Sequence, residues 1–87
     1  MLNKVEIDIL KLLLKDGLVD PMNSRTVANI SKDIGLNNLR VRNNLNHMCN
    51  LGFVKNGYKE RQSKTYYISD IGINEIKGVK DNEKINE

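Results

Sequence analysis

The chain has 87 residues, a net charge of +3 and one cysteine, Cys49. A chain of this length forms a single domain and buries about 60–65% of its unfolded surface, so association with a second copy would stabilise it. The lone cysteine excludes a disulfide framework and a thiolate metal cluster. The first residues, MLNKVEIDIL, lack the features of a signal peptide, and the longest apolar run, LLL, is far too short to span a membrane. We therefore expect a soluble cytoplasmic protein.

The charge is unevenly distributed along the chain. Residues 37–64 contain six basic residues and one acidic residue, a net charge of +5, whereas the remaining residues carry eight basic and ten acidic groups, or −2. A basic half beside a slightly acidic one is typical of proteins that bind a polyanion. Clustering of this size also arises by chance in a short chain, so the pattern needs support from the arrangement of the elements.

Apolar residues at helical spacing predict a first helix over residues 2–15. One apolar stripe consists of Leu2, Val5, Ile9, Leu12 and Leu13. A second stripe, about 100–160° around the helix, consists of Ile7, Leu10 and Leu14. One stripe should join the core, and the other needs a partner, which is either a C-terminal helix or a second subunit. Ile7, Leu10 and Leu14 are therefore candidates for a dimer face.

Two short helices are predicted next. Pro21 interrupts the helical pattern, and Thr26 is positioned to cap a second helix that ends at Gly35. Asn37 can cap a third helix, about residues 38–51, whose inward side is marked by Val41, Leu45 and Met48. Two short helices joined by a glycine turn form a helix-turn-helix, and the third helix is then its reader helix.

The pattern changes from helix to strand after Gly52. Phe53, Val54 and residues 65–68 are rich in β-formers, and the polar stretch KNGYKERQSK between them fits a hairpin. Ser69 can cap a fourth helix with Ile73 and Ile76 facing inward. The domain is predicted to cover residues 1–78, followed by a polar tail or frayed helix over 79–87.

This order of elements resembles the winged helix-turn-helix DNA-binding domains of bacterial regulators. The resemblance covers residues 5–76 and rests on the glycine turn IGL, the spacing from Val41 to Gly52-Phe53-Val54, and the segment YYISDIG after the hairpin. It implies an α+β fold with a three-helix core, a β-hairpin wing and a C-terminal helix. It does not assign a subfamily.

The resemblance gives the exposed polar residues of the reader helix and the wing a role. With the apolar side inward, Arg42 can bond guanine and Asn43 or Asn46 can bond adenine in a major groove. Leu39 can meet a thymine methyl, or it packs in the turn or at a dimer contact. The wing, about residues 55–64, is expected on phosphates or in the minor groove. The predicted DNA-binding residues are Asn37, Asn38, Leu39, Arg40, Arg42, Asn43, Asn46, His47, Lys55, Lys59, Arg61 and Lys64. Arg25 and Lys32 are further candidates for contacts to the DNA backbone.

Several residue types carry less information than their number suggests. The thirteen asparagines are also what an A/T-rich coding sequence would produce, so the arginines carry more weight. His47 is the only histidine, which argues against a metal site and favours a surface position or a phosphate contact. Cys49 is expected to be structural, and no cofactor is predicted.

These features favour a sequence-specific double-stranded DNA-binding protein, a homodimer that acts as a transcriptional regulator. An accessory DNA-binding protein of a plasmid or phage, acting in transfer, replication or partition, is the alternative. A winged-helix protein-interaction module is a further alternative. An enzyme is not expected, because the sequence has no Gly-rich phosphate loop and no plausible pair of catalytic carboxylates.

Overall fold

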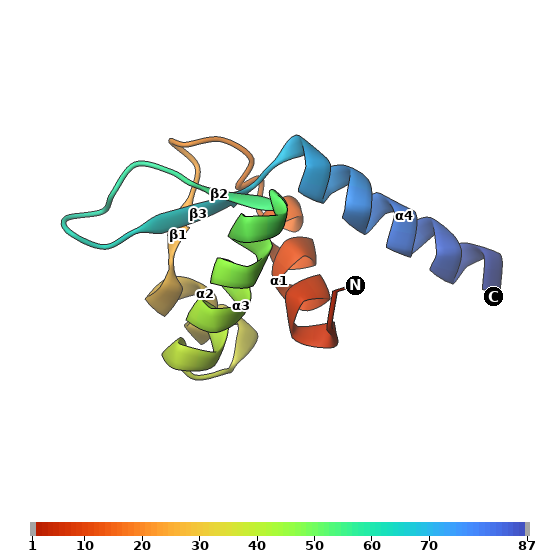
Figure 1. Ribbon diagram of the computed structural model, residues 1–87, viewed down its shortest axis with the longest axis horizontal. Helices are drawn as coiled ribbons and strands as arrows, with labels where there is room; N and C mark the ends of the chain where they lie inside the picture. The colour runs from red at the N-terminus through yellow and green to blue at the C-terminus, as the bar shows by residue number, and fades with distance from the viewer. Residues whose placement is uncertain (1, 87) are drawn as a thin grey trace.

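The computed structural model describes the backbone of residues 2–86 and the side chains of residues 2–78. Its elements are α1 (Lys4–Lys15), β1 (Arg25–Thr26), α2 (Val27–Ile34), α3 (Asn38–Leu51), β2 (Val54–Asn56), β3 (Thr65–Ile68) and α4 (Asp70–Asn86). Three helices pack below a small sheet, and α4 leaves the domain at its upper edge (Figure 1). This order confirms the predicted α+β winged helix-turn-helix fold.

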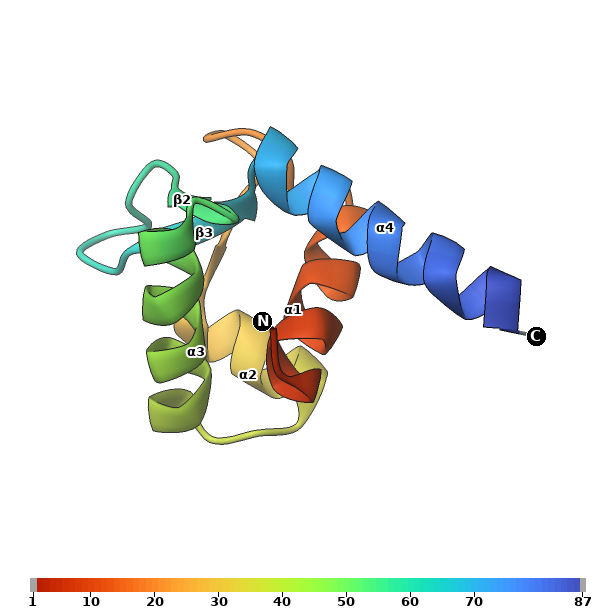
Figure 2. The same cartoon turned by 45° about the vertical axis from the view of Figure 1, so that its right-hand side comes forward.

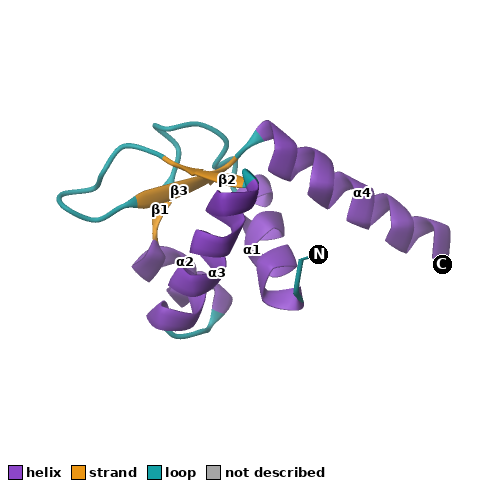
Figure 3. Ribbon diagram, viewed as in Figure 1, coloured by secondary structure: helices purple, strands orange, loops and turns teal. Residues whose placement is uncertain are grey.

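The sheet has three antiparallel strands in the order β1-β3-β2 (Figure 3). On one side of β3, Arg25 pairs with Tyr66 and Thr26 with Thr65; on the other side, Val54 pairs with Ile68. The central strand is well buried, since Tyr66 is 3% exposed and Ile68 is fully covered. The short β1 therefore ties the start of α2 to the base of the wing.

The predicted caps set the ends of the helices. The side chains of Thr26 and Asn37 accept hydrogen bonds from the backbone of α2 and α3 respectively, and Gly35 ends α2 in the left-handed conformation at φ 82°. The first helix begins later than the apolar pattern indicated. Asn3 and Glu6 form a capping box there, so Leu2 precedes the helix and is buried as part of the core.

The core lies between α1, α2, α3 and the sheet. Its fully covered side chains are Ile9, Leu10, Leu13, Ile30, Val41, Leu45, Met48 and Ile68. The prediction of a dimer face on α1 is therefore wrong for Leu10, which has no exposed surface in a single chain. The physical reason is that α1 packs against α2, α3, α4 and β3 of its own subunit, so its second apolar stripe is largely covered within the chain. Ile7 and Leu14 remain half-buried.

The junction between α3, the sheet and α4 is tightly packed. The Ser69 hydroxyl donates to the Gly52 carbonyl and accepts from the Gly72 backbone N–H, which caps α4 as predicted. A side chain at Gly72 would meet the Phe53 carbonyl, so glycine lets α4 approach the end of α3. The helix continues to Asn86 and extends away from the core (Figure 2). It thus includes most of the predicted tail, while Glu87 lies outside the described residues. Within the described part of the chain, no helix has the length and apolar character needed to cross a membrane.

Candidate nucleic-acid interface

The reader helix α3 has one buried side and one polar, exposed side. Val41, Leu45 and Met48 are fully covered and hold it on the core. Steps of about 100° per residue place Leu39, Asn43 and Asn46 on the opposite side, and all three are exposed. The exposed fraction of Leu39 is 63%, so the interpretation in which it packs within the turn is wrong. The same side carries Asn50, also exposed, which the sequence interpretation left out.

The wing projects from the sheet next to this helix (Figure 1). Every residue from 58 to 64 is exposed, as is Lys55 on β2. At the tip, Glu60 and Ser63 exchange two backbone hydrogen bonds of 2.9 and 3.0 Å, which closes a tight turn over Arg61 and Gln62. Arg61 takes a positive φ of 59° there, a conformation that favours glycine. The turn therefore carries an arginine at a position where the backbone conformation favours glycine.

The base of the wing is anchored to the loop after α1. The Tyr58 N–H donates to the Pro21 carbonyl at 3.1 Å, and the Thr65 hydroxyl donates to the Tyr58 carbonyl at 2.7 Å. Gly57 makes this close approach possible, because a Cβ there would lie 2.7 Å from the Pro21 carbonyl oxygen. The hairpin is consequently fixed to the domain up to Tyr58. Between Tyr58 and Thr65, the turn closed by Glu60 and Ser63 holds it together.

A polar cavity of about 520 Å³ separates the wing from α3. One wall is formed by Asn38, Arg42 and Asn46 of α3, and the facing wall by Gln62, Ser63 and Lys64 of the wing. The floor includes Tyr66 and the beginning of α2, with Thr26, Val27 and Ala28. The structure thus brings four of the predicted residues to one cleft, lined mainly by polar groups: Asn38, Arg42, Asn46 and Lys64. The other predicted residues do not line it, namely Asn37, Leu39, Arg40, Asn43, His47, Lys55, Lys59 and Arg61.

Some residues of this cleft were missed by the sequence interpretation. Gln62 and Ser63 are uncharged wing residues, and Thr26 was noted only as a helix cap. The signal for Thr26 was its position: a cap leaves backbone N–H groups of the first turn open, and such groups attract anions. No local pattern marked Gln62 or Ser63, because their place in the cleft depends on how the hairpin bends toward α3.

Arg25 does not face this cleft as a free cation. Its guanidinium contacts the carboxylate of Asp33 and lies 3.2 Å from that of Asp16. The predicted DNA-backbone contact of Arg25 stays a proposal, and the structure adds two carboxylates that pair with its guanidinium and hold it against the end of α1. Lys32 is exposed on α2 and keeps its predicted role as a proposal.

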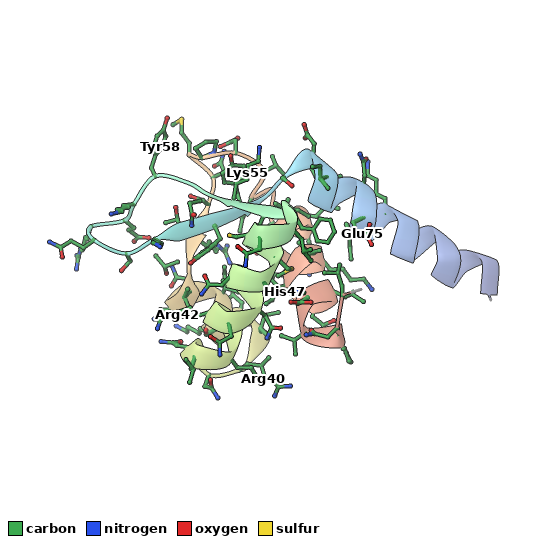
Figure 4. All side chains as sticks on the ribbon, in the orientation of Figure 1. Arg40, Arg42, His47, Lys55, Tyr58 and Glu75 are labelled. Carbon is green, nitrogen blue, oxygen red and sulfur yellow. The ribbon has the colours of Figure 1, made fainter. Side chains whose placement is uncertain are left out.

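His47 also has a partner within the domain. Its Nδ1 atom lies 2.7 Å from Oε2 of Glu6, and its side chain remains 52% exposed. It lies on the side of α3 toward α1, whereas Arg42 lies on the other side of the helix, toward the wing (Figure 4). The predicted direct DNA contact of His47 stays a prediction, and the structure adds a contact between two helices.

The cysteine and the acidic side chains are the remaining groups that could be reactive or bind a metal. Burial raises the pKa of the Cys49 thiol, and the positive charge of Lys64 opposes this only in part. A raised pKa keeps the thiol protonated and unreactive, which fits the expected structural role. Among the residues that the structure describes, no group of three His, Cys, Asp or Glu side chains could hold a metal ion.

The comparisons with known proteins give the fold and its family. No protein-family model and no curated protein matches the chain. Among solved structures, it is similar to the DNA-binding TubR fragment from Clostridium botulinum, with 30% identity and a TM-score of 0.74 over 91% of this chain and 98% of that fragment.

Two more distant likenesses show the fold alone. MepR of S. aureus, in a complex with DNA, is 14% identical with a TM-score of 0.78 over 99% of this chain and 68% of that one. The homodimeric winged helix-turn-helix DNA-binding domain of a possible ArsR-family transcriptional regulator from Mycobacterium bovis is 22% identical with a TM-score of 0.71, over 94% of this chain and 69% of that one. Together with the 30% identity to the TubR fragment, the shared architecture shows that the chain belongs to the winged helix-turn-helix family of DNA-binding domains.

Proposed function

We propose that the protein is a sequence-specific double-stranded DNA-binding regulator, with α3 in the major groove and the wing on the adjacent backbone or minor groove. The observation that carries the proposal is the cleft between Arg42 and Asn46 of α3 and Lys64 of the wing. In this arrangement α3 reaches base edges from its outer side and from its wall of the cleft, while the wing meets the adjacent phosphate backbone. The family membership supports the same function.

The outer side of α3 sets the sequence preference in this proposal. It offers amides from Asn43 and Asn46, which suit adenine, and the apolar Leu39, which suits a thymine methyl. Arg42, on the cleft side, is the candidate for guanine. We therefore expect A·T pairs at the positions that face Leu39, Asn43 and Asn46, with one G·C pair beside them.

The wing supplies most of the affinity that does not depend on sequence. Four of the six basic residues between 37 and 64 lie there, namely Lys55, Lys59, Arg61 and Lys64. Phosphate contacts release counterions, so binding should weaken steeply as salt increases. Arg61, at the tip, is the candidate for the minor groove.

A homodimer is part of the proposal. One reader helix contacts only a few base pairs, and two copies would double the contact and read two half-sites. Ile7 and Leu14 remain as candidate interface residues, since they are only half-buried in the single chain. The related M. bovis domain is homodimeric. Sedimentation or light scattering of the DNA-free protein will test the oligomeric state.

Transcription regulation is the first assignment, since MepR is a transcription regulator. The proposed role is non-enzymatic, and it locates the protein in the cytoplasm, where the DNA is. Chromatin immunoprecipitation followed by sequencing will distinguish this assignment from a role in plasmid or phage DNA handling. A regulator should occupy promoters of several genes, whereas an accessory protein should occupy repeated sites near a transfer, replication or partition region.

The decisive experiment for DNA binding is fluorescence anisotropy on two duplexes across a salt series. One duplex is enriched from a random library with this protein, and the other is a scrambled version of it. We expect tight binding to the first, weaker binding to the second and a steep loss of both with salt. Equal binding to both duplexes would reduce the protein to a non-specific binder. No binding at low salt would contradict the proposal and point to a protein partner.

A further inference from the structure

Glu6 is the only buried charged side chain among the residues that the structure describes, with 1% of its surface exposed. One carboxylate oxygen, Oε1, accepts the Asn3 backbone N–H at 3.2 Å and completes the capping box of α1. The other oxygen, Oε2, lies 2.7 Å from Nδ1 of His47 on the reader helix. Since a glutamine completes a capping box as well as a glutamate, the cap alone does not explain a buried charge.

A second hydrogen bond links the same two helices. Asn3, the other member of the capping box, donates from its side-chain amide to Oδ1 of Asn44 at 3.0 Å. Asn44 in turn donates to the Arg40 carbonyl of α3 at 2.8 Å. Asn44 and His47 are one helical turn apart, so both lie on the side of α3 that faces the start of α1.

These contacts add a directional restraint to the packing of the core. The fully covered side chains of Val41, Leu45 and Met48 hold α3 against the domain, although the free energy gained by burying apolar surface does not itself depend on direction. Hydrogen bonds are directional, and those to a charged group are shorter and stronger than neutral ones. The contact of His47 with Glu6 is of this charged kind, and that of Asn44 with Asn3 is neutral. Together, one turn apart on one side of α3, they oppose a rotation of the helix about its own axis. That rotation is the one that would turn Leu39 and Asn43 away from the base edges.

We propose that Asn3 and Glu6 of α1 are positioning residues for DNA recognition, which act through Asn44 and His47 to set the rotation of the reader helix. The inference rests on the proposed function. Glu6 is too deeply buried to touch DNA, so any change in sequence preference caused by its substitution must be transmitted through α3.

The test uses four single variants of the full chain and the double variant Glu6→Met/His47→Ala. Glu6→Met keeps the side-chain length but removes the acceptor, and His47→Ala removes the donor. His47→Asn restores a donor near the place of Nδ1. Asp8→Asn is the matched control, because Asp8 lies on α1 and forms an ion pair with Lys4 of the same helix, at 3.2 Å. Thermal unfolding by circular dichroism sets a temperature at which each variant is folded, and binding is measured on the selected and scrambled duplexes.

The readout is the ratio of the two affinities, because loss of folded protein lowers both equally. We expect Glu6→Met and His47→Ala each to reduce the ratio about tenfold, as the loss of a charge-assisted hydrogen bond would. The double variant should be no worse than either single variant, whereas His47→Asn and Asp8→Asn should keep a ratio near that of the wild type. Amide hydrogen exchange of residues 38–44 in the DNA-free protein should accelerate in Glu6→Met and not in Asp8→Asn.

The other outcomes separate the alternatives. Equal loss of affinity for both duplexes in Glu6→Met would mean a purely structural role and would overturn the inference. Loss of DNA affinity in His47→Ala, without any change in affinity in Glu6→Met, would make His47 a direct phosphate contact. That result would also overturn the inference. A wild-type protein that does not distinguish the duplexes would instead contradict the proposed function.

Discussion

The reader helix and the wing carry the candidate DNA-binding residues, but the fold holds them very differently. Three fully covered side chains, two caps and the contacts with α1 hold α3 in place. The wing is attached at its base through Tyr58 and Thr65, and its residues 58–64 are all exposed. The difference matches two tasks, because base edges must be met with accurate geometry, whereas phosphates carry no sequence information and tolerate an adaptable arm.

The largest effect that separates the two regions should come from the core side of α3. Leu45→Ala removes a fully buried side chain and should lower the free energy of unfolding by about 2–5 kcal/mol, because it leaves a cavity. Lys59→Ala, on the exposed wing, should leave it nearly unchanged. Urea denaturation followed by circular dichroism measures both. Similar losses in the two variants would contradict the view of a wing that is independent of the core.

Gly57→Ala should damage the base of the wing while leaving α3 intact. The added Cβ would lie 2.7 Å from the Pro21 carbonyl oxygen, and relief of such a clash costs about 1–3 kcal/mol. Gly78→Ala is the matched control, because a Cβ there meets nothing within 4 Å and alanine favours a helix. Hydrogen exchange should show faster opening of residues 54–68 in Gly57→Ala, with α3 protected as in the wild type.

Arg42→Ala and Lys64→Ala compare the two walls of the cleft in DNA binding. Arg42→Ala should weaken binding to the selected duplex by about 1–3 kcal/mol and relax the base preference, since it removes a base contact. Lys64→Ala should weaken binding to both duplexes and reduce the slope of log K against log salt by about one. Anisotropy titrations at four salt concentrations distinguish the two results. If both variants changed the affinities for the two duplexes equally, the helix and the wing would not have separate roles in specificity and affinity.

The smallest effect is expected at the wing tip, where stability and binding should change in opposite directions. Arg61→Gly removes a side chain from a positive-φ position and should stabilise the domain by up to about 1 kcal/mol. The same change removes a cation and should weaken binding to DNA. Thermal unfolding and anisotropy on one preparation test both changes, the gain in stability and the loss of DNA affinity. A variant that is more stable and binds DNA as tightly as the wild type would show that Arg61 has no role in binding.

Local signals in the sequence were enough to predict most elements. Thr26 and Asn37 cap α2 and α3 because their side chains bond to backbone groups three residues away. Gly35 and Gly52 end the same helices in the left-handed conformation. Such contacts involve neighbours in the chain, so residue type and spacing reveal them. The apolar spacing of Val41, Leu45 and Met48 was equally informative, since a helix repeats its buried side every three to four residues.

Pairings between distant residues could not be predicted in this way. Glu6 and His47 are 41 positions apart, and Arg25 meets Asp16 and Asp33 only after α1 and α2 have packed. Each of these residues, taken alone, is a charged group with many possible partners. The same limit explains why Leu10 was assigned to a dimer face, although α1 is covered on several sides within its own chain.

The sequence by itself thus determined the winged helix-turn-helix order, the ends of its helices, the inward side of α3 and the basic character of the wing, because these depend on local hydrogen bonds, periodicity and composition. Only the tertiary structure decided which polar residues remain open to a ligand. It placed Arg42 and Lys64 across one cleft and paired Arg25 and His47 with carboxylates. The physical reason is that charge neutralisation and burial depend on groups brought together from separate parts of the chain.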